Sequence, residues 1–175
     1  MYTLSLSEDK VLQIVRGDIT EQPDIECIVN SANSQLLPGG GVSGAIHKKA
    51  GPELYEYCKK LAPIKVTQAV ITPAFKLPNK YIIHTLGPVY GVDKPEDELL
   101  KKTYQNCMEL ADKQGIKSIA FPSISTGIFG YPINLAAPIA IKAILEKLVD
   151  TRISLVRMVL WSEEDYKVYE GVVAQ

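Results

Sequence analysis

Several residue types that mark common functional classes are scarce in this sequence. It contains two histidines and three cysteines, and Cys27, Cys58 and Cys107 lie far apart without a Cys-x-x-Cys pair. An odd number of separated cysteines argues against a disulfide framework and against a zinc site. We therefore expect reduced, buried thiols, a cytoplasmic protein, and neither a metal ion nor another cofactor.

A strong charge of one sign and long apolar runs are also lacking. The net charge is −1, so the summed field cannot hold a nucleic-acid backbone as a basic domain does, and we expect no nucleic-acid partner. No apolar stretch approaches the length of a membrane span, and Met1–Leu6 lacks the basic region and apolar run of a signal peptide. We expect neither membrane insertion nor export.

The two most familiar nucleotide-binding fingerprints are missing as well. The chain lacks the GxxxxGK[ST] spacing of a nucleoside-triphosphate loop. It also lacks the full fingerprint of a dinucleotide-binding fold: Gly39, Gly41 and Gly44 have the GxGxxG spacing, but they do not directly follow the predicted strand over 26–30. Triphosphate hydrolysis and dinucleotide redox chemistry therefore lose support.

The residues that are present have the pattern of one α/β domain over residues 1–175. The chain is 46% hydrophobic and 22% charged, which is typical of a globular protein. Tyr2–Leu6 and Val11–Arg16 resemble two short strands joined by a polar hairpin loop. Further strands are predicted over 26–30, 69–72, 81–86, 117–122 and 154–160, and helices over 44–50, 52–61, 95–114, 134–148 and from 163 onward.

The alternation of strands and helices predicts the layers of the fold. It favours a mostly parallel sheet covered by helices on both faces, with the initial hairpin adding antiparallel strands at an edge. We therefore expect a three-layer α/β/α sandwich with a mixed, mostly parallel sheet. In such sheets ligands bind outside the carboxyl ends of the strands.

Two unusual loops fall at that edge. Gly39-Gly40-Gly41-Val42 precedes a helix, and successive glycines let consecutive N–H groups point into one phosphate-binding concavity beside the helix N-terminus. Ser123–Gly130 follows a strand and offers hydroxyls, free N–H groups and two glycines. Taken singly, the first could be a flexible loop and the second a capped turn, but two such loops at one edge favour phosphate binding.

Three polar side chains near the same edge have two interpretations each. Asp18 could accept a hydrogen bond from the exocyclic amine of adenine, or could cap a helix. Asn30 and Asn33 could bind ribose hydroxyls, or could hold a turn because asparagine tolerates left-handed geometry.

Five motifs in order closely resemble the macro domain family. They are Gly17-Asp18-Ile19-Thr20, Ile28-Val29-Asn30-Ser31-Ala32-Asn33, Gly39-Gly40-Gly41-Val42 with Ala45-Ile46-His47, Tyr81-Ile82-Ile83-His84-Thr85-Leu86-Gly87-Pro88, and Phe121-Pro122-Ser123-Ile124-Ser125-Thr126-Gly127. The resemblance extends from about Val15 to the last helix and implies an ADP-ribose-binding domain.

The resemblance also implies roles for individual residues. Asp18 would contact adenine, Ile19 would add a backbone contact near the base, and Asn33 would face the distal ribose. Trp161 or Ser162 would border the adenine pocket. The diphosphate would be held by two loops consisting of Gly39, Gly40, Gly41 and Val42, and of Ser125, Thr126, Gly127, Ile128 and Phe129.

The segment Gly39–Gly51 is most similar to the branch that removes mono-ADP-ribose from acidic side chains and deacetylates O-acetyl-ADP-ribose. That branch usually has Asp where this chain has Ser43, while the histidine four residues later is retained as His47. A serine hydroxyl is a poor general base without a neighbouring base to assist it. His47 could assist Ser43, or the pair could serve packing and capping.

Two functions therefore remain open, together with a third that would use the same pocket. The first is a metal-free hydrolase in which Asn33, Ser43 and His47 are the candidate catalytic residues. The second is a non-catalytic reader, and the third is an ADP-ribose 1″-phosphate phosphatase. In each case the partner is ADP-ribose or an ADP-ribosylated protein, and we expect a monomer. His84 lies within a strand pattern, so we place it in the core or behind the site.

Overall fold

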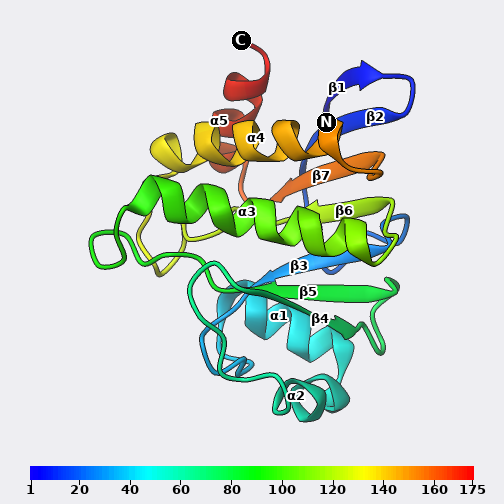
Figure 1. Ribbon diagram of the computed structural model, residues 1–175, viewed down its shortest axis with the longest axis vertical. Helices are drawn as coiled ribbons and strands as arrows, with labels where there is room; N and C mark the ends of the chain where they lie inside the picture. Colours follow the sequence, from blue (N-terminus) through cyan, green and yellow to red (C-terminus); the bar gives the residue numbers. More distant parts are fainter.

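Seven strands form one mixed sheet in the computed structural model, which describes residues 1–175 (Figure 1). Across the sheet the strands follow the order β1-β2-β7-β6-β3-β5-β4. Their bounds are β1 Tyr2–Ser7, β2 Lys10–Arg16, β3 Cys27–Ser31, β4 Ala69–Pro73, β5 Tyr81–Thr85, β6 Ser118–Phe121 and β7 Leu155–Leu160.

The middle of the sheet is parallel and both edges are antiparallel. Strands β2, β7, β6, β3 and β5 pair in parallel, and β1 pairs with β2 as the predicted hairpin. The mixed, mostly parallel sheet is thus confirmed. The sequence did not predict that β4 also runs antiparallel to β5. The connection over 74–80 is too short for a crossover helix, so the chain can only turn back.

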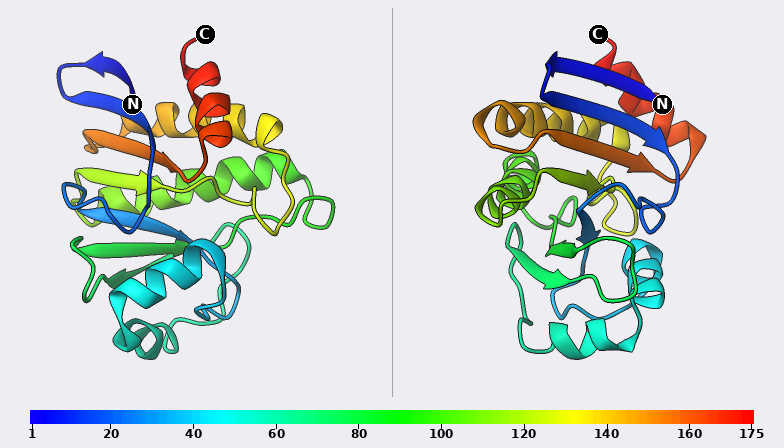
Figure 2. Two further views of the ribbon diagram at one scale, coloured as in Figure 1. Left: turned by 180° about the vertical axis from the view of Figure 1, so that it is seen from behind. Right: turned by 90° about the vertical axis from the view of Figure 1, so that its right-hand side faces the viewer.

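Five helices cover the two faces of the sheet (Figure 2). Their bounds are α1 Gly41–Ala50, α2 Pro52–Cys58, α3 Glu96–Lys113, α4 Ile133–Asp150 and α5 Glu163–Val173. One hydrophobic core includes residues of α3, α4 and α5, and a second, on the other side of the sheet, includes residues of α1 and α2. The predicted three-layer sandwich is therefore confirmed.

Strand β3 shows how the sheet divides the two cores. Cys27 and Val29 belong to the core under α3 and α4, whereas Ile28 belongs to the core under α1. This follows because successive side chains of a strand point to opposite faces.

All three cysteines are buried and unpaired, as predicted. None of the five helices combines the length and the apolar character that a membrane span requires.

The parallel arrangement brings several loops to one edge of the sheet. Strands β2, β3, β6 and β7 end at Arg16, Ser31, Phe121 and Leu160, and the segments that follow these ends are neighbours in space (Figure 1). Helix α1 begins at Gly41 rather than at the predicted Gly44, so part of the glycine triplet forms its first turn.

Candidate functional site

A cleft with two connected halves lies at this edge of the sheet. The first half has a volume of about 490 Å³ and the second about 320 Å³, and both are lined by Gly41, Val42, Ser123 and Gly127. These shared residues come from the two glycine-containing loops. The two loops therefore border the middle of one continuous cleft.

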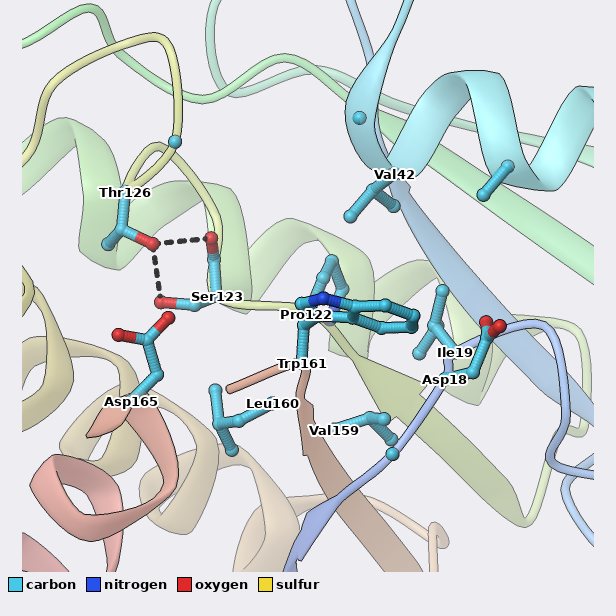
Figure 3. Close-up of a pocket in the computed structure, with 14 residues that line it drawn as sticks. Asp18, Ile19, Val42, Pro122, Ser123, Thr126, Val159, Leu160, Trp161 and Asp165 are labelled. Carbon is cyan, nitrogen blue, oxygen red and sulfur yellow. Dashed lines mark hydrogen bonds between the residues drawn. The ribbon is translucent and has the colours of Figure 1, made fainter. Parts of the chain in front are cut away.

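The first half is mostly apolar and ends at an exposed aromatic ring. Ile19, Pro122, Val159 and Leu160 line it together with Trp161, which is 76% exposed (Figure 3). Of Trp161 and Ser162, the two residues predicted to border an adenine pocket, Trp161 lines the cleft and Ser162 does not. Ser162 caps helix α5 by accepting a hydrogen bond from the Asp165 N–H at 3.1 Å.

Asp18 lines the same half and also holds a turn. Its Oδ1 accepts hydrogen bonds from the N–H of Thr20 at 2.8 Å and from the Thr20 hydroxyl at 2.7 Å. Its Oδ2 makes no hydrogen bond within the chain and is free to accept one from a ligand. The turn and a ligand contact are therefore compatible at this residue. The alternative role as a helix cap is wrong, because no helix begins between β2 and β3.

The loop that carries Asp18 is fixed from behind by Arg157 of β7. The guanidinium donates to Gln22 Oε1 at 2.9 Å, and Gln22 in turn donates to the Asp18 carbonyl oxygen at 2.9 Å. Arg157 also pairs with both carboxylate oxygens of Asp24, at 2.8 and 2.7 Å, and this contact lowers the pKa of Asp24. The position of Asp18 is thus tied to the sheet through two side chains.

The glycine loop presents unpaired backbone donors to the cleft. No N–H group from Gly39 to Ser43 donates a hydrogen bond within the chain. Gly39 and Gly41 have φ values of 58° and 56°, in the left-handed region that favours glycine. Gly44 allows the loop to fold closely over α1, since a Cβ there would lie 2.7 Å from the Gly39 carbonyl oxygen. The loop therefore has the features of a phosphate-binding concavity at a helix N-terminus.

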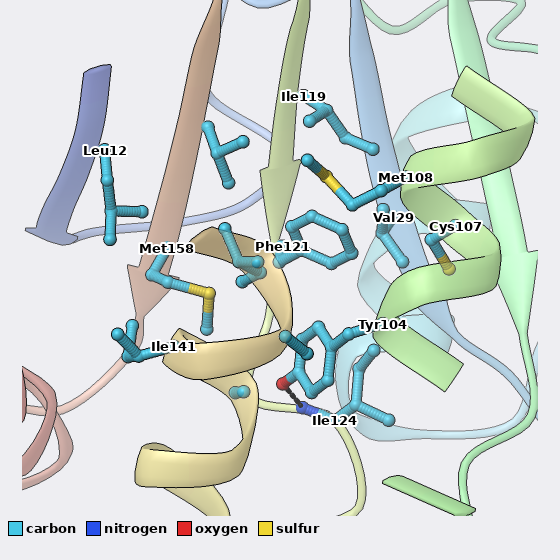
Figure 4. Close-up of a cluster of buried hydrophobic side chains, with 14 of the residues drawn as sticks. Leu12, Val29, Tyr104, Cys107, Met108, Ile119, Phe121, Ile124, Ile141 and Met158 are labelled. Atoms are coloured by element: carbon cyan, nitrogen blue, oxygen red, sulfur yellow. Dashed lines mark hydrogen bonds between the residues drawn. The ribbon is translucent and has the colours of Figure 1, made fainter. Parts of the chain in front are cut away.

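The second loop has the same property. The N–H groups from Ser125 to Phe129 make no hydrogen bond within the chain, whereas the preceding Ile124 N–H donates to the Tyr104 hydroxyl at 3.0 Å (Figure 4). Ser125 is a non-glycine residue at φ 69°, a conformation that the surrounding structure must hold in place. Gly87 provides the room, because a Cβ there would lie 2.3 Å from the Ser125 hydroxyl.

Asn33 lies in the second half of the cleft, where it also closes a loop. Its side-chain nitrogen donates to the Leu37 carbonyl oxygen at 2.9 Å, and its oxygen accepts from the Leu37 N–H at 2.9 Å. Ile128 and Phe129 line the same half, and Ile128 is 98% exposed. The hydroxyl and amide side chains of this half, together with its exposed rim at Ile128, suit a ribose that carries a further substituent.

Asn30 lies behind the wall of the cleft and not on it. Its side chain is fully buried, with its nitrogen 3.3 Å from the Ser43 hydroxyl and 3.1 Å from Nδ1 of His84. The predicted contact of Asn30 with a ribose is therefore not supported by its position. His84 is buried behind the site, where burial chiefly, and the charge of His47, lower its pKa to about 3.

The structure does not form the serine–histidine pair that the sequence left open. The Ser43 hydroxyl donates to the Leu37 carbonyl oxygen at 3.3 Å, and neither ring nitrogen of His47 has a hydrogen-bond partner. His47 lines a separate pocket with Pro38 and Tyr55, and burial lowers its pKa. Asn33 and Ser43 line the second half of the cleft, and His47 does not.

Ser123, the first residue of the predicted second loop, lines both halves of the cleft. Asp165 lines the first half and was missed by sequence reasoning. It gave no signal, since an acidic residue in the first turn of a helix is ordinary. No group of His, Cys, Asp or Glu side chains could hold a metal ion, and no Lys or Arg lines the cleft.

Comparison with known proteins places this geometry in a family. The sequence model of the Macro domain matches residues 29–140. The chain belongs to the macro domain family. The resemblance seen in the five motifs is thereby confirmed.

Several relatives match this macro domain over nearly its whole length. An O-acetyl-ADP-ribose deacetylase of Salmonella newport is 45% identical over 172 residues, with 94% of each chain covered. The Oceanobacillus iheyensis macrodomain with ADP has a TM-score of 0.94 and 42% identity, covering 99% of this chain and 94% of its own. The Trypanosoma brucei macrodomain in complex with ADP-ribose has a TM-score of 0.87 and 35% identity, and the match covers 93% of this chain and 68% of its own.

Proposed function

We propose that this macro domain binds ADP-ribose along the cleft, with adenine in the first half and the distal ribose in the second. The observation that carries the proposal is the pair of loops whose backbone N–H groups, Gly39–Ser43 and Ser125–Phe129, are unpaired at the middle of the cleft. A diphosphate placed there would accept hydrogen bonds from both loops and would lie at the N-terminus of α1.

The two ends of the cleft support the same orientation. The first half offers Trp161 and Ile19 for the faces of a base and Asp18 Oδ2 for its exocyclic amine. The second half has no tryptophan, and its hydroxyl and amide side chains, Ser31, Asn33 and Ser43, suit a ribose. The relatives whose descriptions name ADP, ADP-ribose or O-acetyl-ADP-ribose support this choice of ligand.

We further propose that any hydrolysis of mono-ADP-ribose esters or of O-acetyl-ADP-ribose is slow. Asn33 in the distal half and the deacetylase relative favour hydrolysis. Ser43 argues against a fast reaction, because its hydroxyl is engaged with Leu37 and Asn30 and has no base beside it. Positioning of the ester and activation of water by the ligand phosphate would then provide the catalysis.

Calorimetry with ADP-ribose, AMP and ribose 5-phosphate tests the binding proposal. We expect a dissociation constant for ADP-ribose that is micromolar or lower, which corresponds to about −8 kcal/mol, and much weaker binding of the two fragments. Equal affinities for ADP-ribose and AMP would contradict a diphosphate site between the loops. Release of ADP-ribose from a protein that is mono-ADP-ribosylated on acidic residues would measure the hydrolysis.

A further inference from the structure

One charged side chain of the cleft has no role in the binding of base, diphosphate or distal ribose described above. Asp165, in the first turn of α5, lines the first half of the cleft. Its backbone N–H belongs to the helix cap, but its carboxylate makes no hydrogen bond or ion pair within the chain. Glu163, two residues earlier, is paired with Arg16 at 2.9 Å. Asp165 is thus an available acceptor that faces the cleft.

Contacts of α5 place this carboxylate beside the second loop. Tyr169, four residues later and on the same face of the helix, has its hydroxyl 2.8 Å from Ser123 Oγ. Burial chiefly, with a contribution from the charge of Asp165, raises the pKa of Tyr169 to about 12. Figure 3 shows the Asp165 carboxylate directed toward the side of the cleft where Ser123 lies.

Ser123 marks a boundary within the cleft. It lines both halves, whereas Asp165 lines only the first, so a group next to both residues lies between the base in the first half and the diphosphate in the middle. In ADP-ribose the group at that position is the adenosine ribose, which carries free 2′ and 3′ hydroxyls. These two hydroxyls are hydrogen-bond donors, and an ionised carboxylate is an acceptor with two oxygens.

We infer that Asp165 accepts hydrogen bonds from the adenosine ribose and makes the cleft select ADP-ribose over 2′-phosphorylated ADP-ribose. This inference rests on the proposed ADP-ribose function. A 2′-phosphate would replace a donor by an anion next to the carboxylate, and no Lys or Arg lines the cleft to offset the repulsion. Dinucleotide-binding folds distinguish their cofactors by the same chemistry, with an acidic residue on the 2′-hydroxyl or an arginine on the 2′-phosphate.

Calorimetry with ADP-ribose and 2′-phospho-ADP-ribose tests the inference on four proteins. They are the wild type, Asp165→Asn, Asp165→Arg and the control Glu164→Gln, which removes a charge from the same helical turn at a residue that does not line the cleft. We expect the wild type and Glu164→Gln to bind the 2′-phosphorylated ligand at least about tenfold more weakly than ADP-ribose. Asp165→Asn should reduce this difference in affinity between the two ligands. Asp165→Arg should reduce it further or make the 2′-phosphorylated ligand the tighter binder.

The outcomes separate the inference from the proposed function. If the wild type binds ADP-ribose but does not distinguish the two ligands, the inference is wrong and the proposed function stands. The inference is also wrong if Asp165→Asn and Asp165→Arg distinguish ADP-ribose from 2′-phospho-ADP-ribose as strongly as the wild type does, because other residues would then cause the selectivity. If the wild type binds no ADP-ribose, the proposed function fails and the inference fails with it.

Discussion

The side-chain nitrogen of Asn30 lies 3.1 Å from Nδ1 of His84, and both side chains are fully buried. The other ring nitrogen of His84 lies 3.0 Å from the Thr72 hydroxyl, which donates to the Pro73 carbonyl oxygen. Since the Asn30 nitrogen can only donate, Nδ1 accepts and Nε2 carries the proton. The Asn30 side-chain nitrogen also donates to the Ser43 hydroxyl, so a chain of hydrogen bonds leads from Thr72 in strand β4 to Ser43 at the cleft.

This arrangement predicts that the stability of the protein falls in mild acid. The pKa of His84 is about 3 in the folded state because of its burial, whereas an unperturbed histidine has a pKa near 6.5. Between these values the unfolded state binds more protons, so the free energy of unfolding decreases as the pH falls from about 6.5 toward 3. From pH 7 to pH 5 the loss due to His84 is about 2 kcal/mol.

Urea denaturation at pH 7 and pH 5 would measure this loss. His84→Gln is the control, since glutamine can accept from Asn30 and donate to Thr72 without titrating. We expect the variant to lose about 2 kcal/mol less than the wild type over this pH range. Identical losses in the two proteins would show that His84 does not cause the acid sensitivity.

Asp18→Ala is expected to weaken ADP-ribose binding by about 1 to 3 kcal/mol, the scale of a hydrogen bond to a charged group. The variant also loses the turn that Asp18 Oδ1 forms with Thr20. Thr20→Val is the matched control, because it removes the Thr20 hydroxyl and leaves Asp18 Oδ2 in place. Calorimetry on both variants distinguishes the two roles: equal losses of affinity would assign the effect to the turn and not to a contact with adenine.

Trp161→Ala is expected to weaken the binding of ADP-ribose and AMP by similar factors and to leave ribose 5-phosphate unaffected. Stacking of a base on an aromatic side chain contributes about 1 to 3 kcal/mol, and only the first two ligands contain the base. Trp161 is the one tryptophan of the chain and is 76% exposed, so its fluorescence reports directly on the first half of the cleft. An unchanged emission spectrum at saturating ADP-ribose would place the base elsewhere.

The type and order of the elements could be predicted because each has a local signal. The β-branched and apolar residues of Val11–Arg16 and the helical period over Pro95–Gln114 need no information from distant residues. The position of β7 between β2 and β6 could not be predicted, since strand order depends on which hydrophobic faces pack together across the whole chain. The antiparallel β4 is an intermediate case, because its short connection to β5 was visible in the sequence.

Individual site residues show the same division between local and distant signals. Asn30 lies in strand β3, where alternation places its side chain on the face of the buried Ile28, while Asn33 lies beyond the end of the strand. Alternation could therefore have separated the two asparagines. The approach of Asp165 to Ser123 depends on how α5 docks on the sheet, and no local pattern contains that information.

Gly40→Val and Gly44→Ala are expected to act in different ways. A Cβ at Gly40 meets no atom within 4 Å, so a side chain there would occupy the cleft and weaken binding while the fold is retained. A Cβ at Gly44 would lie 2.7 Å from the Gly39 carbonyl oxygen, so even alanine would displace the loop and lower stability. Thermal unfolding and calorimetry on both variants measure the two effects. Normal ADP-ribose binding by Gly40→Val would exclude this loop as the phosphate site.

Ser43→Asp tests whether the missing carboxylate limits hydrolysis. Position 43 is buried between the Asn30 amide, which would donate to a carboxylate, and the Leu37 carbonyl oxygen, which would repel it. An oxygen turned away from Leu37 would face the distal half of the cleft, where it could orient water. We expect the single-turnover rate to rise by about 10² or more, the usual scale of a positioned acid or base. Affinity for ADP-ribose should gain little, because the new charge lies near an anionic diphosphate.

Ser43→Ala completes this experiment, because it removes the hydroxyl without adding a charge. It leaves the Asn30 donor with one partner fewer and should cost about 1 kcal/mol of stability, whatever its effect on the rate. A wild type that hydrolyses rapidly and is strongly slowed by Ser43→Ala would make the hydroxyl itself catalytic and overturn the slow-hydrolase proposal. Equal rates in the wild type, Ser43→Asp and Ser43→Ala would show that water is activated elsewhere. The Ser43 hydroxyl would then serve only to hold the loop at Leu37, and the ligand phosphate would be the remaining base within reach of the distal ribose.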